Sequence, residues 1–559
     1  LAEDIKEVPT ELEAIVSQIQ LLTESQQIAP VPQPWLPPLN ERMTLQELEP
    51  NQPQEAWAQK KPVSVLLGMA DIPQAQKQEA VSVSLSKDGH ILLYGSPGTG
   101  KTTFLQSAAM DLARKFSPKD VTLYLMDFGT NGLAPLSNLP HVADTMLLDQ
   151  TEKIAKFVRI MERELSRRKK LLSDYGVGTL ELYRQASGKE EPAIVILLDS
   201  YESMKEEAYE LELFKLLVRI SREGLSIGVH LLVTAGRQSN LRAQFYANFK
   251  HQLTLPQNDV GEVRSIVGST PLAATMEDIK GRALMKRDEV DVIQLALPVA
   301  GANDAQVLNN LRQEVASLQE AWTGETPQAI PMVPEELTNE NFYNRPSIQA
   351  VYEGGLVPLG LDMETVKPVI WDLSKGNLLY LTEQAEQMTT LTQHIARGKQ
   401  SVIVLAPPSA SSIVEAGAGV AFENQIPEVE KLLAVLESKL KYNLKQGLTN
   451  HMATVVVYNA VELVEKINPE SQRRLTFIFE QGLSGGYASI VMATPTLSRS
   501  IETPLRLAKG FKQGLISMRL NDQTILASGN KPTREPLLGP QVHYFIQENT
   551  VHQIKVLMR

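Results

Sequence analysis

The stretch HILLYGSPGTGKTTFLQSAAMDLARKF, residues 90–116, joins three local patterns that together decide the fold. HILLYG (90–95) is a short apolar run typical of a buried strand, and residues 102–116 have the apolar spacing of a helix. Between them, residues 95–102 fit the pattern G-x-x-x-x-G-K-S/T, whose backbone N–H groups surround a phosphate. The order of strand, loop and helix therefore predicts a P-loop in a parallel sheet.

The loop supplies the candidate cofactor-binding residues. Its glycines let the backbone N–H groups point at a β-phosphate, and the following helix adds the positive end of its dipole. Lys101 would neutralise the β- and γ-phosphates, and Thr102 offers a hydroxyl to Mg²⁺. ATP and Mg²⁺ are the expected cofactors. The candidate residues are Gly95, Ser96, Pro97, Gly98, Thr99, Gly100, Lys101, Thr102 and Thr103.

Further strand-like runs follow the loop. VTLYLMDF (121–128), AIVILLD (193–199) and VHLLVTA (229–235) are continuous apolar runs, and a long amphipathic helical pattern lies at 151–172. Short buried strands that alternate with helices indicate a parallel sheet covered on both faces. The predicted fold class is α/β, with a RecA-like P-loop NTPase domain at residues 61–299.

Asp199 ends the run AIVILLD and is the candidate for the acid that supports Mg²⁺; the alternative is a helix cap. Hydrolytic members of this class usually have Glu at the next position, where this chain has Ser200. This difference predicts weakened hydrolysis and unaffected binding. Glu202 is a candidate substitute acting through a water. Thr234 is a candidate sensor of the γ-phosphate, and its alternative is an ordinary β-branched residue at a strand end.

Several basic residues allow both a functional and a structural interpretation. Arg237, Arg222 and Arg219 are candidates for an arginine finger that reaches a neighbouring subunit's nucleotide, and the alternative for each is a surface arginine. The run RRKK (167–170) favours the end of a long helix, where cations suit the helix dipole, over a nucleic-acid patch.

The same series of patterns occurs a second time. NLLYL (377–381) resembles ILLYG, TVVVYN (454–459) resembles AIVILLD, and ASIVMATP (488–495) resembles VHLLVTAG. The offsets agree, since 459 − 199 = 260 and 494 − 234 = 260. We interpret this agreement as two homologous α/β domains in tandem. The predicted organisation is a helix and Pro-rich linker at 1–60, the first domain at 61–299, a linker at 300–345 and the second domain at 346–559.

The second copy lacks the chemistry of the first. Its loop reads LTEQAEQM (381–388), in which Glu383 and Glu386 would repel a triphosphate and no glycine is present. Asn459 is expected at the position of Asp199, so Mg²⁺ would lose its anionic support. We therefore expect that the second domain binds no ATP in the usual way and that its surface serves other contacts.

Composition excludes some classes of function. The chain has 559 residues and no cysteine, so disulfides and thiolate-bound metals are excluded. The net charge of −11 disfavours nucleic acid as a partner. No apolar run reaches the ~18–20 residues that cross a bilayer. The chain opens on Leu1, so we expect a soluble fragment whose membrane anchor lies outside it.

Taken together, the motifs resemble the FtsK/SpoIIIE-type membrane ATPases of type VII secretion systems, the EssC/EccC family. The segments that carry the resemblance are WLPPLNERMTLQEL (35–48), GSPGTGKTT (95–103), GLAPLSNLPHVAD (132–144), ERELSRRKKLL (162–172), ILLDSYE (196–202) and VHLLVTAGR (229–237). With the degenerate repeat they cover essentially the whole chain, which resembles the last two ATPase domains of such a protein.

The resemblance implies an ATPase that assembles as a hexamer at the cytoplasmic face of the bacterial cell membrane, with further ATPase domains upstream. Its implied partners are secreted WXG-motif proteins, recognised through a C-terminal signal, and the second domain would receive that signal. The site residues carried over are Gly95 to Thr103 and Asp199, which would hold Mg-ATP. Two alternatives remain, a double-stranded DNA translocase and a non-catalytic scaffold stabilised by ATP.

Overall fold

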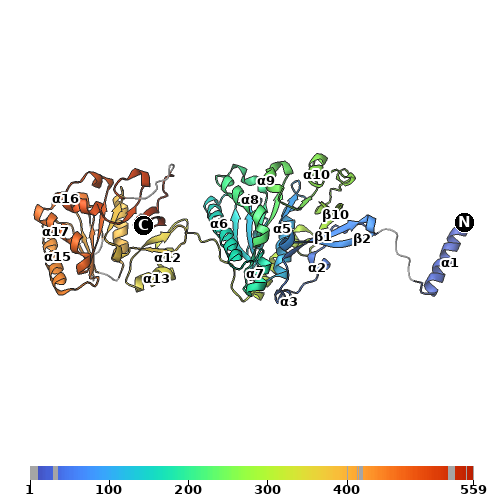
Figure 1. The fold of residues 1–559 in the computed structure, drawn as a ribbon, viewed down its shortest axis with the longest axis horizontal. Coiled ribbons are helices and arrows are strands. Elements are labelled where there is room, and N and C mark those ends of the chain that lie inside the picture. Colours follow the sequence, from blue (N-terminus) through green and yellow to red (C-terminus); the bar gives the residue numbers. More distant parts are fainter. Residues whose placement is uncertain are drawn as a thin grey trace, which may run out of the picture. The chain divides into compact units, whose positions relative to one another are not determined.

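A computed structural model of the chain describes residues 10–28, 36–398, 401–411, 413, 419–526, 535–548 and 550–557. The chain divides into two compact units, Leu1–Ile330 (unit 1) and Pro331–Arg559 (unit 2). In Figure 1 unit 1 runs from blue to yellow-green and unit 2 from yellow to red. Within the described ranges, no helix combines the length and apolar character of a bilayer-crossing segment.

Unit 1 contains a ten-stranded sheet in the order β2-β1-β10-β9-β8-β3-β7-β6-β4-β5. The strands from β8 to β5 run parallel, and β9, β10, β1 and β2 extend the sheet with antiparallel pairs. The strands are β1 (Ser64–Ile72), β2 (Lys77–Ser84), β3 (Ile91–Tyr94), β4 (Val121–Asp127), β5 (Val142–Leu147), β6 (Ala193–Asp199), β7 (Val229–Ala235), β8 (His251–Thr254), β9 (Arg282–Lys286) and β10 (Val290–Leu295).

The helices of unit 1 flank this sheet (Figure 1), with the exception of α1, which has no buried residue. They are α1 (Glu11–Ser25), α2 (Leu45–Leu48), α3 (Pro53–Trp57), α4 (Leu85–Asp88), α5 (Lys101–Lys115), α6 (Thr151–Asp174), α7 (Leu180–Ser187), α8 (Glu210–Ile227), α9 (Ala243–Tyr246), α10 (Val260–Val267) and α11 (Asp304–Ala321). The helix α5 packs on β1, β4, β6 and β7, and α6 packs on α8. Because α5 is buried along most of its length, the loop that precedes it is held rigidly at the edge of the sheet.

Unit 2 repeats this architecture strand for strand. Its sheet has the order β12-β11-β20-β19-β18-β13-β17-β16-β14-β15, which is the order of unit 1 with ten added to each number. The strands are β11 (Pro358–Asp362), β12 (Pro368–Ile370), β13 (Leu378–Leu381), β14 (Ser401–Leu405), β15 (Val420–Glu423), β16 (Ala453–Val457), β17 (Tyr487–Ala493), β18 (Gln513–Ile516), β19 (Val542–Gln547) and β20 (Thr550–Lys555). The predictions of a parallel core and of a tandem repeat are confirmed. The antiparallel extension of each sheet was not predicted.

The core of unit 2 has two layers. One face of its sheet packs on α14 (Ala385–Ala396), the counterpart of α5. The other face packs on α15 (Ile426–Gln446), α16 (Ala460–Lys466), α17 (Pro469–Gln481) and α18 (Thr503–Lys509). Two short helices, α12 (Asn339–Tyr343) and α13 (Pro346–Glu353), precede the sheet.

The strand registers correct one detail of the predicted repeat. Ile194 pairs with the first residue of β7 and lies five positions before Asp199. Ala453 pairs with the first residue of β17 and lies five positions before Tyr458. The residue at the place of Asp199 is therefore Tyr458, and the prediction of Asn459 there was wrong. The offset is 453 − 194 = 259 between β6 and β16 and 487 − 229 = 258 between β7 and β17, so the single offset of 260 read from the sequence misplaces the strand ends.

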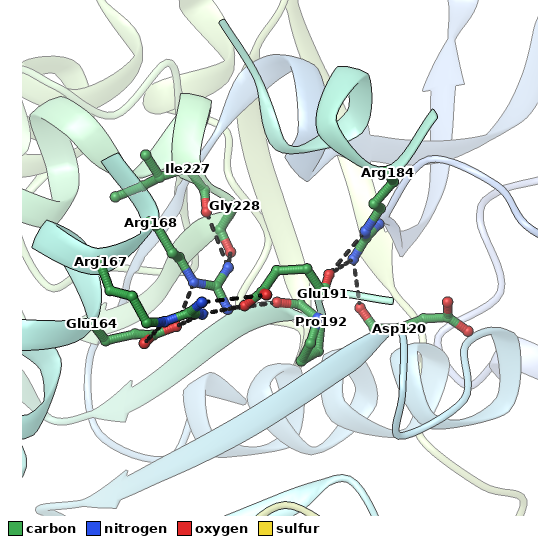
Figure 2. A network of polar contacts seen from close by, with 9 residues as sticks. All are labelled: Asp120, Glu164, Arg167, Arg168, Arg184, Glu191, Pro192, Ile227 and Gly228. Atoms are coloured by element: carbon green, nitrogen blue, oxygen red, sulfur yellow. Dashed lines mark hydrogen bonds and ion pairs between the residues drawn. The ribbon is translucent and has the colours of Figure 1, made fainter. Parts of the chain in front are cut away.

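A buried polar network explains part of the run RRKK. Arg168 is only 2% exposed and lies inside α6, which ends at Asp174 and not at the run itself. Its guanidinium donates to the carbonyl oxygens of Ile227 at 3.0 Å and Pro192 at 2.8 Å, and its Nε donates to Glu164 at 2.7 Å (Figure 2). Neither a helix end nor a nucleic-acid patch accounts for Arg168.

The same network joins the amino ends of two neighbouring strands. Pro192 precedes β6, and Gly228, a further acceptor of Arg168 at 3.4 Å, precedes β7. Arg184 on α7 donates to the carbonyl oxygens of Glu191 at 2.7 Å and Asp120 at 3.0 Å. These contacts lie at the edge of the sheet opposite the P-loop, because the P-loop follows the carboxyl end of β3.

Buried histidines make the stability of unit 1 depend on pH. Burial lowers the pKa of His90 and of His141 to about 4, and that of His230 to about 3. In the unfolded chain the same groups have a pKa near 6.5, so between about pH 4 and 6.5 the unfolded state binds more protons than the folded state. Stability is therefore lost as the pH falls from about 6.5 toward 4.

We expect unfolding of the chain at pH 5.5 to take up protons, with His90, His141 and His230 contributing up to one each. Calorimetry of thermal unfolding in buffers of different ionisation enthalpy measures this uptake. Unfolding at pH 8 is the control, where these histidines are neutral in both states. A midpoint temperature unchanged between pH 6.5 and 4.5 would contradict the expectation.

Candidate nucleotide-binding site

The P-loop of unit 1 connects β3 to α5, and its glycines are required by its shape. Gly98 and Gly100 have φ values of +81° and +118°, which residues other than glycine rarely adopt. A Cβ atom at Gly95 would lie 2.7 Å from the hydroxyl oxygen of Thr99 and 2.8 Å from Cβ of Leu255. The glycines predicted from the pattern therefore serve two purposes, a left-handed backbone and close packing.

The backbone of this loop suits a polyphosphate. The N–H groups of Gly98, Gly100, Lys101 and Thr102 have no protein acceptor among the residues that the structure describes. They lie at the start of α5, where the helix dipole is positive. Unpaired N–H groups at a helix start form an anion site, so the loop fits the phosphates of a nucleotide.

Lys101 completes this cradle. Its Nζ donates to the carbonyl oxygens of Gly95 at 2.7 Å and Ser96 at 3.0 Å, which holds the ammonium group within the loop. Burial lowers the pKa of Lys101, and the negative charges of Glu202 and Asp199 oppose that shift. A phosphate would add negative charge beside the ammonium and strengthen its charged form.

Asp199 is the centre of a polar cluster at the carboxyl edge of the sheet. Its Oδ2 accepts from the hydroxyl of Thr102 at 2.7 Å, and its Oδ1 accepts from the hydroxyl of Thr234 at 2.6 Å. The carboxylate is buried, and no metal-binding cluster of three or more acids or histidines occurs in the described ranges. A hydroxyl and a carboxylate in contact are nevertheless the oxygen pair that a Mg²⁺ bound to phosphates needs from the protein.

The structure brings the remaining catalytic candidates to the same edge. Ser200 has a left-handed backbone with φ of +63°, and its N–H donates to the hydroxyl of Thr234 at 2.9 Å. The carboxylate of Glu202 accepts from the N–H of Gly236 at 3.1 Å and affects the pKa of Lys101. Glu202 is thus close to the P-loop lysine, while the residue directly after Asp199 carries only a hydroxyl.

Sequence reasoning missed Asp127 and the segment after it. Asp127 pairs with Asp199 across neighbouring strands, and its Oδ2 accepts from the N–H of Leu133 at 2.7 Å. Burial raises the pKa of Asp127, and the charge of Asp199 raises it further against the hydrogen bond from Leu133. A Cβ at Gly132 would lie 2.3 Å from the Thr102 side chain. The signal was present, since LYLMD ends in an acid just as AIVILLD does.

The arginine candidates occupy different surroundings. Arg219 forms ion pairs with Glu162 of α6 and, at 3.1 Å, with Glu223 of its own helix. Arg222 is exposed on α8, and Arg237 is exposed just after the carboxyl end of β7. Of the three, Arg237 lies at the edge of the sheet that carries Asp199, and its role in a neighbouring subunit stays a prediction.

In unit 2 the loop between β13 and α14 is equivalent to the P-loop, and its side chains bind or pack against other residues of the unit. Gln387 is buried and accepts from the hydroxyls of Thr382 and, at 3.4 Å, Tyr380. Met388, which directly precedes the second Thr-Thr pair as Lys101 precedes the first, is 2% exposed within the apolar core. The hydroxyl of Tyr458 donates to the carbonyl oxygen of Ala385 at 3.1 Å.

The acidic residues of this degenerate loop lie outside its core. Glu383 lies on the loop and Glu386 lies in the first turn of α14, and both are exposed. Thr389 lies 3.1 Å from the Tyr458 hydroxyl, as Thr102 lies beside Asp199. Tyr458 thus preserves the contact between the end of β16 and the start of α14, but it has no carboxylate like that of Asp199. That unit 2 binds no ATP stays a prediction.

Comparisons with known proteins agree with the geometry. Residues 48–274 match the model of the FtsK/SpoIIIE family. The chain is 36% identical over 365 residues to the type VII secretion system protein EssC of Staphylococcus aureus, covering 65% of this chain and 24% of that protein. It is 32% identical over 386 residues to the ESX secretion system protein YukB of Bacillus subtilis, covering 69% of this chain and 25% of that protein.

Two solved structures resemble the fold of the whole chain. One is EssC (ATPases 2 and 3) from Geobacillus thermodenitrificans, with a TM-score of 0.83, 24% identity and coverage of 94% of this chain and 100% of that one. The other is Thermomonospora curvata EccC (ATPases 2 and 3) in complex with a signal sequence peptide, with a TM-score of 0.58, 22% identity and the same coverage. The chain spans about a quarter of the length of the curated relatives it matches.

Proposed function

Because residues 48–274 form a domain of the FtsK/SpoIIIE family of P-loop ATPases, we propose that this chain is the ATP-binding part of a type VII secretion ATPase. In this proposal unit 1 holds Mg-ATP, with the phosphates at residues 95–103 and Mg²⁺ at Thr102 and Asp199. The observation that supports it most directly is the set of unpaired N–H groups at the start of α5, beside the contact of 2.7 Å between Thr102 and Asp199. Loss of ATP binding on substitution of Lys101, described in the Discussion, tests it.

The proposal includes a division of labour between the units. Unit 2 has the same fold without a phosphate cradle, so it would serve substrate recognition or regulation of the export of WXG-motif proteins. The placement of the chain in a longer protein, in a hexamer at the cytoplasmic face of the bacterial membrane, is part of the same proposal. The similarity to EssC, a type VII secretion system protein, and to YukB, an ESX secretion system protein, supports the assignment to a secretion system.

A peptide that ends in the C-terminal signal of a WXG-motif protein should bind the chain, with or without Mg-ATP. Fluorescence anisotropy of a labelled peptide measures this, and a scrambled peptide of equal composition is the control. The Lys101→Ala variant should bind the peptide as the wild type does, since its substitution lies in unit 1. Binding to duplex DNA at low salt, with none to the peptide, would instead favour a DNA translocase.

Replacement of Ser200 by Glu tests whether this unit is a working motor or a scaffold that ATP stabilises. Ser200 lies directly after Asp199, where hydrolytic members carry Glu, so Ser200→Glu should raise the rate of ATP hydrolysis at least about tenfold. Ser200 already carries a Cβ atom on a left-handed backbone, so the change to Glu adds no new backbone strain of this kind. Phosphate release measures the rate, and Ser200→Gln, which has the same shape without the charge, is the matched control. Equal rates in both variants would show that another group limits hydrolysis.

A further inference from the structure

We propose that Asp127 is a second acid of the Mg²⁺ site, which supports the ion from the strand next to that of Asp199. This inference rests on the function proposed above, because Mg²⁺ enters the site with the nucleotide. Asp127 ends β4 as Asp199 ends β6, and the two residues pair in register. The P-loop pattern does not include Asp127, so its role follows from its place in the sheet.

The two carboxylates lie on one face of the sheet. Residues that pair directly on neighbouring strands point to the same face, because side chains alternate along each strand. The carboxylate of Asp199 reaches α5 through its bond to Thr102, so that of Asp127 lies on the α5 face as well. The strands β4 and β6 are parallel, so both acids are at the carboxyl edge that carries the P-loop.

This pair of acids has two buried carboxylates and no cation bound to either. Asp127 is 2% exposed and Asp199 is 1% exposed, and neither forms an ion pair within the ranges that the structure describes. The Oδ1 atom of Asp127 is buried and has no hydrogen-bond partner among the described residues. The ammonium of Lys101 donates instead to carbonyl oxygens of the loop. Burial of an unpaired carboxylate costs free energy, so the pair suits a positive ion.

The segment after Asp127 passes directly beside the candidate ligands of the metal. The hydrogen bond from the N–H of Leu133 to Asp127 closes this segment into a loop. A Cβ atom at Gly129 would lie 3.1 Å from Oδ2 of Asp199, and one at Gly132 would lie 2.3 Å from Cγ2 of Thr102. Asp127 thus belongs to the same compact group of residues as the two that are proposed to bind Mg²⁺.

Unit 2 lacks both acids. Leu405 pairs with Val457, so the next residues, Ala406 and Tyr458, occupy the places of Asp127 and Asp199. Ala406 is buried, and β14 forms and pairs with β16 without an acid at its end. The fold therefore does not require a carboxylate at this place. The unit with a phosphate cradle has both acids, and the unit without a cradle has neither.

The substitution Asp127→Asn tests the charge, because Asn keeps the shape and an oxygen that can accept from Leu133. In the full chain we expect this variant to bind Mg-ATP at least about tenfold more weakly. Binding of ATP in EDTA should stay unchanged or become tighter, since one negative charge fewer lies beside the triphosphate. Titration calorimetry with ATP, once in excess Mg²⁺ and once in EDTA, measures both affinities. A role in folding alone would weaken both by the same factor.

Asp120→Asn is the matched control, because Asp120 directly precedes β4 at the opposite edge of the sheet. Asp120 is also buried, but it has a cation, in an ion pair of 2.6 Å with Lys60. Its substitution should leave the ratio of the two ATP affinities unchanged. Mn²⁺ in place of Mg²⁺ gives a second readout through the EPR signal of the free ion. With ATP present, Asp127→Asn should bind Mn²⁺ at least about tenfold more weakly than the wild type or Asp120→Asn.

The same gain of ATP affinity from Mg²⁺ in Asp127→Asn as in the wild type would overturn the inference, and so would equal losses of affinity in Mg²⁺ and in EDTA. Either result, together with greatly weakened ATP binding in Lys101→Ala, would leave the proposed function intact. ATP binding that survives Lys101→Ala unchanged would overturn the function itself.

Discussion

Substitution of Lys101 by Ala should greatly reduce the stabilisation of unit 1 by Mg-ATP. The lysine lies in the loop within hydrogen-bonding reach of two carbonyl oxygens, and it is the one cation of the pattern. A hydrogen bond between a charged group and a phosphate contributes about 1.5–3 kcal/mol, so its loss weakens binding roughly 10- to 100-fold. At an ATP concentration 100 times the wild-type Kd, ATP stabilises the wild type by about 2.7 kcal/mol, and at the same concentration the variant should keep only about 0.4–1.4 kcal/mol.

The measurement is the shift of the midpoint temperature on addition of millimolar Mg-ATP. In the wild type we expect a shift of several degrees, since 1 kcal/mol corresponds to ~2–4 °C for a domain of 150–250 residues. Lys215→Ala is the control, because Lys215 is an exposed lysine on α8 whose one ion pair among the described residues is with Glu212. Without ATP the two variants should unfold close to the wild type. An equal ATP-induced shift in Lys101→Ala would show that the nucleotide binds elsewhere.

Replacement of Arg168 by Met should destabilise unit 1 by about 3–5 kcal/mol. Met keeps an unbranched apolar stem and removes the guanidinium with its charge, which leaves the carbonyl oxygens of Ile227 and Pro192 without their buried donor. Glu164 would also lose a partner. Burial raises the pKa of Glu164, yet its bonds to Arg167 and Arg168 outweigh this effect and lower it to about 2.

The adjacent residue is a matched control. Arg167 binds Glu164 and Glu191 in the same network, but its side chain is 48% exposed. Exposed ion pairs contribute about 0–1 kcal/mol, so Arg167→Met should have a small effect on the free energy of unfolding. Urea denaturation measures both. The network lies at the edge opposite the P-loop, so folded Arg168→Met should still bind Mg-ATP. Equal losses in the two variants would contradict the structural role of Arg168.

Much of the fold followed from local patterns in the sequence. The P-loop, the strand that ends in Asp199 and the helical pattern at 151–172 are each contiguous, and each predicts its own conformation without knowledge of its neighbours. The repeat was visible for the same reason, since two copies of one series of patterns predict two copies of one fold. The roles of Asp199, Glu202 and Thr234 stay predictions, although the structure brings all three to one edge of the sheet.

Other features depended on the registers of the strands and on contacts between distant segments. Tyr458 occupies the place of Asp199, as the pairing of β16 with β17 and of β6 with β7 shows. The sequence alone does not reveal this register, because the offset between the two repeats is not the same for each strand. The run RRKK was interpreted as the end of a long helix, whereas the burial of Arg168 depends on where β6 and β7 begin. Helix, strand and loop patterns depend on residues that are adjacent in the chain. The sequence by itself therefore determined the secondary-structure elements and the phosphate-binding loop. The surroundings of that loop are built from distant segments, such as Thr102 beside Asp199 and Thr99 beside Gly281, and only tertiary packing decided which of these residues meet.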